Sequence, residues 1–140
     1  MPLMWNKSLE TGIRELDLQH QELLEIANEL ERCVNDGNQH RAWEEVLPRF
    51  SGYALFHFAT EENLLIGLPS VAKELAAHIA EHRTFAMKVE ALRTSAPDLD
   101  GLREFIDYLQ KWLVAHIGHS DQALVALVSA AHRTCKNRTA

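Results

Sequence analysis

The stretch from Val71 to Leu92, VAKELAAHIAEHRTFAMKVEAL, decides the fold of this chain. Its core positions alternate in steps of four and three residues, which is the period of a helix packed inside a helical bundle. Histidine occupies two of these positions. The spacing predicts a helix from Ser70 to about Arg93 whose buried face carries two imidazoles. That face comprises Val71, Leu75, His78, His82, Phe85, Val89 and Leu92.

Three further segments show the same helical period, at about 18–36, 40–66 and 98–118. A short apolar run at 123–131 predicts a smaller fifth helix, and no segment alternates as a strand would. Short connections between four long amphipathic helices predict an all-α, up-down-up-down four-helix bundle. We expect a single domain over 1–140, made of an N-terminal arm (1–17), the bundle (18–118) and a C-terminal segment (119–140).

Capping and breaking residues predict where the helices end. Asp17 is a plausible N-cap of the first helix, and Gly37 a plausible C-terminal stop. Pro48 should cost the second helix a backbone hydrogen bond and kink it, or the helix begins near this proline. The run Gly67-Leu68-Pro69 ends the second helix, and Asp98 is a good cap for the fourth.

Charge and composition narrow the class of protein. The 140 residues include 14 Lys and Arg against 20 Asp and Glu, for a formal net charge of −6, and 46% are hydrophobic. This is an ordinary globular composition, and an acidic chain of this size is a poor binder of nucleic-acid phosphates. Cys33 and Cys135 have no metal-type spacing and are expected to be free thiols. Without a signal-peptide or membrane-span pattern, we expect a cytoplasmic protein that contacts neither nucleic acid nor membrane.

Six polar side chains lie where the helical pattern requires core residues. They are His20 on the first helix, His57 and Glu61 on the second, His78 and His82 on the third, and His116 on the fourth. One such histidine alone is usually a satisfied core residue. A set this large is different, because each buried polar group left without a partner costs roughly 1–3 kcal/mol. A metal centre satisfies all of them at once, and imidazole with carboxylate but no cysteine suits iron, manganese or zinc.

Asp121 follows His116 by five residues, which on a continuous α-helix places it about 140° away from the histidine face. The two side chains can converge only if the helix ends between them, and Gly118 offers such an end. Periodicity alone would make Asp121 a solvated N-cap of the last short helix.

Several motifs are spread over the chain from Trp5 to Asp121. They read Trp5, Gly12-Ile13, Leu16-Asp17-Leu18-Gln19-His20, His57-Phe58-Ala59-Thr60-Glu61-Glu62, His78-x-x-x-His82, and Trp112-Leu113-Val114-Ala115-His116-Ile117 followed by Asp121. This set resembles the haemerythrin family, specifically its bacterial single-domain members. All seven ligand positions of that family are filled at the expected spacing, which is far more specific than one short motif.

The resemblance implies a pair of non-haem iron ions, Fe2+ or Fe3+, that binds molecular oxygen. By position, His78, His82 and His116 would hold one iron, His20 and His57 the other, and Glu61 and Asp121 would bridge them beside an oxo or hydroxo bridge. Two octahedral ions offer about twelve positions, and these ligands leave one vacant, on the iron with only two histidines. A vacancy of this kind suits a small diatomic molecule.

Residues next to the ligands extend this prediction. Leu113 resembles the family's oxygen-pocket leucine, and Ile117 and Trp112 are further candidates for an apolar pocket, with Phe58 and Leu24 less strongly supported. Asp17, Gln19, Glu62 and Glu81 are adjacent to ligands and are candidates to accept hydrogen bonds from the free imidazole nitrogens. For Glu62 and Glu81 the plainer interpretation, a solvated helix surface, is favoured.

The leading function is reversible oxygen binding, for storage, for sensing, or for delivery to an oxygen-using enzyme, by a monomer that is not itself an enzyme. The alternative is a di-iron oxidoreductase acting on peroxide or nitric oxide, or a protein that repairs iron centres. In related repair proteins the last carboxylate is generally Glu four residues after its histidine. Asp121 stands five residues after His116, which favours the oxygen-binding branch.

Overall fold

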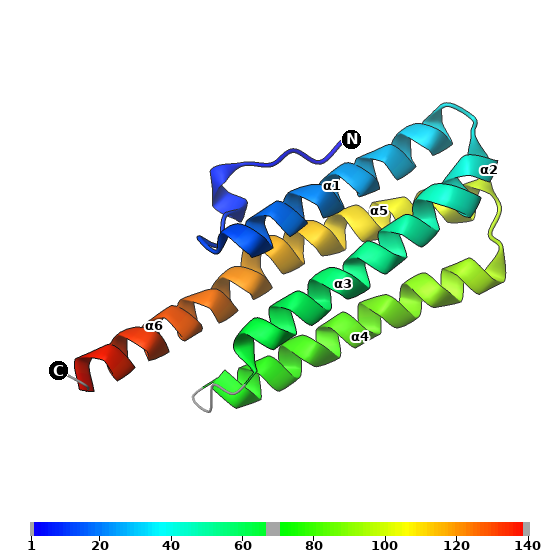
Figure 1. The fold of residues 1–140 in the computed structure, drawn as a ribbon. Coiled ribbons are helices and arrows are strands. Elements are labelled where there is room, and N and C mark those ends of the chain that lie inside the picture. The colour runs from blue at the N-terminus through cyan, green and yellow to red at the C-terminus, as the bar shows by residue number, and fades with distance from the viewer. Residues whose placement is uncertain (1, 67–70, 139–140) are drawn as a thin grey trace.

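Four long helices form a bundle in which successive helices alternate in direction (Figure 1). The computed structural model describes the backbone of residues 2–66 and 71–138, and side chains as far as residue 130. The bundle consists of α1 (Arg14–Asn35), α3 (Leu47–Leu65), α4 (Ala72–Ser95) and α5 (Leu99–Ala115). No strand occurs in the described part of the chain, so the all-α, up-down-up-down prediction is confirmed.

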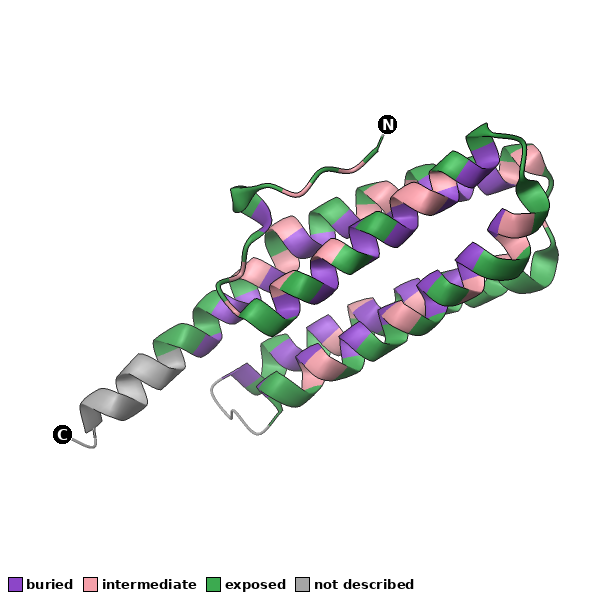
Figure 2. Cartoon of the chain, turned by 45° about the horizontal axis from the view of Figure 1, so that its top comes forward, coloured by how far each residue is buried: buried purple, intermediate pink, exposed green. Residues whose placement is uncertain are grey.

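The core lies along the inner faces of these helices, where Figure 2 shows the buried residues. On α4, the buried positions are those of the predicted seam, with Phe85 fully enclosed and Leu92 partly buried. Burying a large apolar side chain contributes roughly 1.5–3 kcal/mol relative to leaving it in water. The spacing of apolar residues therefore orients each helix, and it turns the polar residues of the seam inward as well.

The first helix begins earlier than the sequence predicts, at Arg14 rather than near Leu18. Asp17 is consequently not its N-cap but lies in its first turn. The Asp17 carboxylate accepts hydrogen bonds from the backbone N–H of Thr11 at 2.8 Å and of Gly12 at 3.2 Å. Gly12 has a φ of +87°, a conformation that glycine adopts readily. Asp17 thus ties the N-terminal arm to the start of α1, where a negative charge also favours the helix dipole.

Two predicted helix boundaries, the C-terminus of α1 and the N-terminus of α5, are confirmed. At the end of α1, Gly37 has a φ of +76° and its N–H donates to the Val34 carbonyl, while the next residue, Asn38, donates to the Cys33 carbonyl. This pair of bonds is a Schellman ending. At the start of α5, the Asp98 side chain accepts from the Gly101 N–H at 2.9 Å.

Pro48 lies inside a continuous helical run from Gln39 to Leu65, so the helix does not begin at this proline. The predicted segment 40–66 is divided into α2 (Gln39–Arg41), the π-helical η2 (Ala42–Val46) and α3, which begins at Leu47 with Pro48 in its first turn. Val46 and Leu47 keep right-handed helical backbone angles, and the irregularity is the π-helical stretch just before the proline, where the Leu47 N–H donates to the Ala42 carbonyl. Gly67-Leu68-Pro69 and the predicted cap Ser70 lie outside the described residues.

The prediction that the fourth helix ends at Gly118 is wrong. After Ala115 the chain continues through a π-helical segment, η4 (His116–Asp121), directly into α6 (Gln122–Arg138), which is much longer than the predicted 123–131 (Figure 1). Leu124 and Val128 of α6 pack against Leu65 and Leu75, at the ends of α3 and α4. No helix in the described residues is long and apolar enough to cross a membrane.

Candidate metal centre

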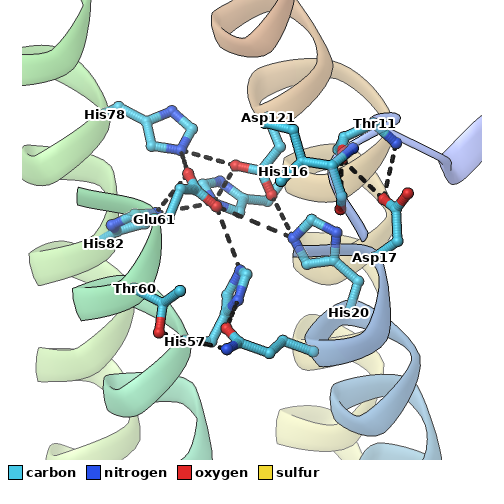
Figure 3. Close-up of polar contacts among 12 residues, drawn as sticks. Thr11, Asp17, His20, His57, Thr60, Glu61, His78, His82, His116 and Asp121 are labelled. Atoms are coloured by element: carbon cyan, nitrogen blue, oxygen red, sulfur yellow. Dashed lines mark hydrogen bonds and ion pairs between the residues drawn. The ribbon is translucent and has the colours of Figure 1, made fainter. Parts of the chain in front are cut away.

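All seven predicted ligands meet inside the bundle (Figure 3). α1 contributes His20, α3 contributes His57 and Glu61, α4 contributes His78 and His82, and η4 contributes His116 and Asp121. Each of the seven is at most 5% exposed. The i, i+4 spacing on α3 and α4 stacks each pair on one helical face, as the sequence predicts.

The π-helical segment is what brings Asp121 to the other ligands. In a π-helix the backbone hydrogen bonds join residues i and i+5 and each turn holds about one residue more than in an α-helix, so side chains five apart lie near the same face. His116 Nε2 consequently lies 3.0 Å from Asp121 Oδ1. Gly118 is helical, and a Cβ at this position would make only an ordinary contact, at 3.5 Å from Leu9. The convergence predicted from the sequence is correct, but its cause is a wider helical turn and not a helix end.

The predicted ligand atoms form two groups that share both carboxylates. One group contains Glu61, His78, His82, His116 and Asp121, and the other contains His20, His57, Glu61 and Asp121. Within each group the atoms offered for binding lie within 4.8 Å of one another. A shared pair of carboxylates between two sets of imidazoles is the donor arrangement that two adjacent metal ions require.

Several of these buried atoms approach each other without forming hydrogen bonds. His20 Nε2 lies 2.9 Å from Asp121 Oδ2, yet among the described residues neither atom has a hydrogen-bond partner, nor does His57 Nε2 at 3.3 Å from Glu61 Oε2. In the other group, one hydrogen bond of 3.0 Å joins the Nε2 atoms of His82 and His116, so these two nitrogens are not among the unpaired atoms. Leaving such atoms unpaired in a protein interior is costly. The donor set therefore fits metal ions, which would take up these lone pairs together.

The outer nitrogens of three imidazoles face acceptors, which sets their tautomers. His57 Nδ1 lies 2.8 Å from Gln19 Oε1, His116 Nδ1 lies 2.9 Å from Glu81 Oε1, and His82 Nδ1 lies 3.3 Å from Glu62 Oε1. An imidazole that donates from Nδ1 keeps the Nε2 lone pair free for a metal ion. The plainer interpretation of Glu62 and Glu81 as merely solvated is incomplete, because each is partly exposed but also contacts an imidazole of the cluster.

The orientation of the Gln19 amide is fixed by a chain of hydrogen bonds. The Thr60 hydroxyl donates to the Phe56 carbonyl at 3.0 Å, so its oxygen is left to accept from Gln19 Nε2 at 3.3 Å. The amide oxygen then faces His57 and must be the acceptor. His57 consequently presents Nε2, without a proton, to the centre.

Other neighbours differ from the sequence expectation. Asp17 contacts Thr11 and Gly12 rather than an imidazole, and His20 Nδ1 has no hydrogen-bond partner in the part of the chain that the structure describes. Ser120 donates to Glu81 Oε1 at 3.1 Å and so supports the partner of His116. Sequence reasoning missed Ser120, because no spacing rule distinguishes it from a surface serine.

The two shared carboxyls are held in the ionised form. Burial alone would raise the pKa of Glu61, but neighbouring imidazoles, His57 foremost, outweigh burial and lower the pKa to about 2. Burial opposes ionisation of Asp121 in the same way, and the imidazoles around it, His116 foremost, hold its pKa well below the ordinary value. Both groups are therefore anionic at neutral pH and able to bind cations.

The imidazoles divide according to their surroundings. Burial lowers the pKa of His57, against the opposing effect of Glu61. Burial would also lower the pKa of His78 and His116, but the carboxylates beside them outweigh it and raise these values to about 10 and about 9. In the metal-free chain, protons on these two imidazoles neutralise the carboxylates, and binding of a metal would release them.

Aromatic and aliphatic side chains enclose the cluster. Phe58 stacks on His82 with ring centroids 4.0 Å apart, and half-buried Trp112 stacks on His116 at 4.4 Å. Leu113 and Ile117, the other two predicted pocket residues, are each 1% exposed in the core next to His116. Both residues therefore pack in the hydrophobic core. Their role in an oxygen pocket stays a prediction.

Comparison with known proteins identifies the family. The family model described as "Hemerythrin HHE cation binding domain" matches residues 11–128, which is most of the chain and includes all seven predicted ligand positions. The chain belongs to the haemerythrin family. It is 30% identical to the Bacteriohemerythrin of Clostridium acetobutylicum, over 87% of this chain and 98% of that protein. It is also 34% identical to the Bacteriohemerythrin of Stenotrophomonas maltophilia, over 91% of this chain and 82% of the relative.

A more distant relative, the Hemerythrin-like protein of Naegleria gruberi, is 28% identical over 86% of this chain and 88% of its own length. This haemerythrin domain therefore carries a buried histidine and carboxylate cluster able to hold metal ions, as the family description of cation binding states.

Proposed function

We propose that this chain binds molecular oxygen reversibly at a pair of iron ions. The observation that carries the proposal is the pair of ligand groups that share Glu61 and Asp121. His78, His82 and His116 would hold one ion, His20 and His57 the other, and the two carboxylates would bridge them together with an oxo or hydroxo group. When bound, the two iron ions supply the electrons that oxygen takes up on binding.

The protein's own residues orient the ligands and keep water out. Gln19, Glu62 and Glu81 fix the outer nitrogens of three imidazoles and so keep three Nε2 atoms directed at the centre. Leu113 and Ile117 bring hydrocarbon to the same region. An apolar wall limits proton delivery and the release of reduced oxygen, which favours reversible binding over net oxidation.

The names of the curated relatives support oxygen binding as the function, since several are called Bacteriohemerythrin. We propose a monomeric cytoplasmic protein that stores oxygen, senses it or delivers it to an oxygen-using enzyme. The five-residue interval between His116 and Asp121, accommodated by the π-helical η4, favours this function over repair of iron centres.

The test is an oxygen cycle followed by visible spectroscopy. The chain is loaded anaerobically with iron(II), exposed to oxygen, purged, and exposed again. We expect a charge-transfer band that appears with oxygen and disappears on purging through repeated cycles. His57→Ala should lose the band, and the matched variant His119→Ala, at an exposed position that is not a ligand, should keep it. Immediate irreversible oxidation would instead indicate the oxidoreductase, with peroxide and nitric oxide as the substrates to assay.

A further inference from the structure

A cavity of about 200 Å³ lies between α3 and α4, outside the ligand cluster. Figure 1 shows these two helices side by side. Small side chains at their contact, Ser51 and Ala54 on α3 and Ala86 on α4, leave space beside the rings of Phe58 and Phe85. The cavity therefore arises from the sequence itself, because larger residues at these three positions would fill it.

The apolar lining of the cavity favours binding of an uncharged molecule over an ion. Its surface is almost entirely hydrocarbon, and the polar residues among those that line it are Ser51 and Glu90. Glu90 is exposed and already accepts a hydrogen bond from Arg93 at 2.7 Å. An ion of either sign entering the cavity would lose its hydration and meet almost no polar surface to replace it.

The volume of the cavity is large enough for one six-membered aromatic ring. An engineered apolar cavity of about 150 Å³ in another protein stays dry and binds benzene. The opening is flanked by Leu55, which is 53% exposed, and Met87, which is 72% exposed. Methionine is flexible and adapts its shape to an apolar ligand, so the rim can admit a molecule of this size.

Both aromatic walls of the cavity connect to ligand histidines. Phe58 stacks on His82 with a centroid separation of 4.0 Å and an interplanar angle of 9°. Phe85 stacks on Trp112 at 3.8 Å and 12°, and Trp112 stacks on His116 at 4.4 Å and 13°. A molecule that presses on either wall therefore moves a ring in direct contact with a ligand or with a neighbour of a ligand.

We propose that this cavity is a binding site for a small uncharged monocyclic aromatic molecule, and that its occupation shifts the imidazoles of His82 and His116. Binding itself needs no metal, so it stands or fails separately from the proposed oxygen function. The consequence for the centre is regulatory, because the occupant would act on ligands of the metal without touching them.

Toluene is the probe, and sodium benzoate, a ring of similar size with a charge, is its control. Calorimetric titration of the full-length chain, both metal-free and iron-loaded, should show saturable toluene binding to both forms, with benzoate binding at least tenfold weaker. Methyl NMR of the metal-free chain should show shifts at Ala54, Ala86 and Met87. The imidazole signals of His82 and His116 should shift as well, and by more than those of His20, whose ring contact is with His57.

Filling variants locate the site. Ala86→Phe and, independently, Ser51→Leu should weaken toluene binding more than tenfold while circular dichroism stays unchanged. Ala91→Phe, an exposed position on the same helix that does not line the cavity, should bind toluene as the parent does. Equal toluene affinity in a folded filling variant, or equal affinity for benzoate, would overturn the proposed site. Toluene binding without any imidazole shift would overturn the proposed coupling to the centre.

Discussion

Replacing Gln19 by leucine should weaken metal binding without touching a metal ligand. Gln19 is only 7% exposed, and its amide oxygen is the acceptor 2.8 Å from His57 Nδ1. Leucine has a similar size but offers no acceptor. In the variant, His57 Nδ1 loses its partner, and the proton is free to move to Nε2, the nitrogen that the metal needs.

The size of the effect follows from the role of such outer partners. Loss of a group that orients a metal-binding histidine typically costs about 10–100-fold in affinity, or about 1.4–2.7 kcal/mol. Thr60→Val should have a smaller effect in the same direction, because it removes only the 3.3 Å bond that holds the Gln19 amide in place. Gln19→Glu should retain the affinity, since a carboxylate is also an acceptor for Nδ1.

The assay is a competition titration of iron(II) against a chelator of known affinity, performed anaerobically on each variant. Gln21→Leu, at a partly exposed position two residues away, is the matched control and should bind iron as the parent does. Unchanged iron affinity in Gln19→Leu would refute the reasoning, because the Gln19 contact would then not determine which His57 nitrogen carries the proton.

Three further predictions concern the ligands, the pocket and pH. His57→Ala and Glu61→Ala should each lower iron content and reduce the melting temperature of the loaded chain by at least ~5 °C, measured by metal analysis and calorimetry; parental iron content in both would contradict the ligand assignment. Leu113→Ala should cost about 2–5 kcal/mol of stability and speed loss of the oxygenated form in spectra recorded over time, whereas an equal or longer lifetime would show that this residue does not guard the site. In the folded metal-free chain the carboxylates outweigh burial and raise the pKa of His78 to about 10, above its unfolded value of about 6.5. Protonated His78 therefore stabilises the folded chain, fully below pH 6.5, and this contribution is lost as the pH rises through 10. Urea denaturation should therefore find the metal-free chain less stable at pH 10 than at pH 7, and the reverse order would be contrary to this assignment.

The predicted ligands on α3 and α4 could be found from the sequence because their relative positions depend only on the spacing of residues within one helix. His78 and His82 stand on one helical face whatever the rest of the chain does, and the apolar residues around them determine which face is buried. The same reasoning places His57 and Glu61, since Pro48 lies too far upstream to disturb their helical turn.

Asp121 shows where periodicity fails. A rule of about 100° per residue assumes an unbroken α-helix, whereas η4 is π-helical and adds about one residue to each turn. Nothing in the residue types of 116–121 distinguishes this geometry from a helix end at Gly118. Only the requirement that Asp121 reach the other ligands indicated that the regular period must be interrupted there.

The contacts of Glu62 and Glu81 were not predictable for another reason. Each lies next to a ligand in sequence and therefore points roughly 100° away from that ligand on its own helix. Each instead reaches an imidazole of a different helix, Glu62 contacting His82 and Glu81 contacting His116. Such contacts depend on how neighbouring helices are rotated against each other, which a single helical pattern does not specify.

Anomalous diffraction from crystals of the iron-loaded chain tests the central claim most directly. We predict two iron peaks per chain, one among His78, His82 and His116 and the other beside His20 and His57. Glu61 and Asp121 should contact both ions. A single peak, or iron bound away from these seven side chains, would contradict the assignment of a two-iron centre and with it the proposed binding of oxygen.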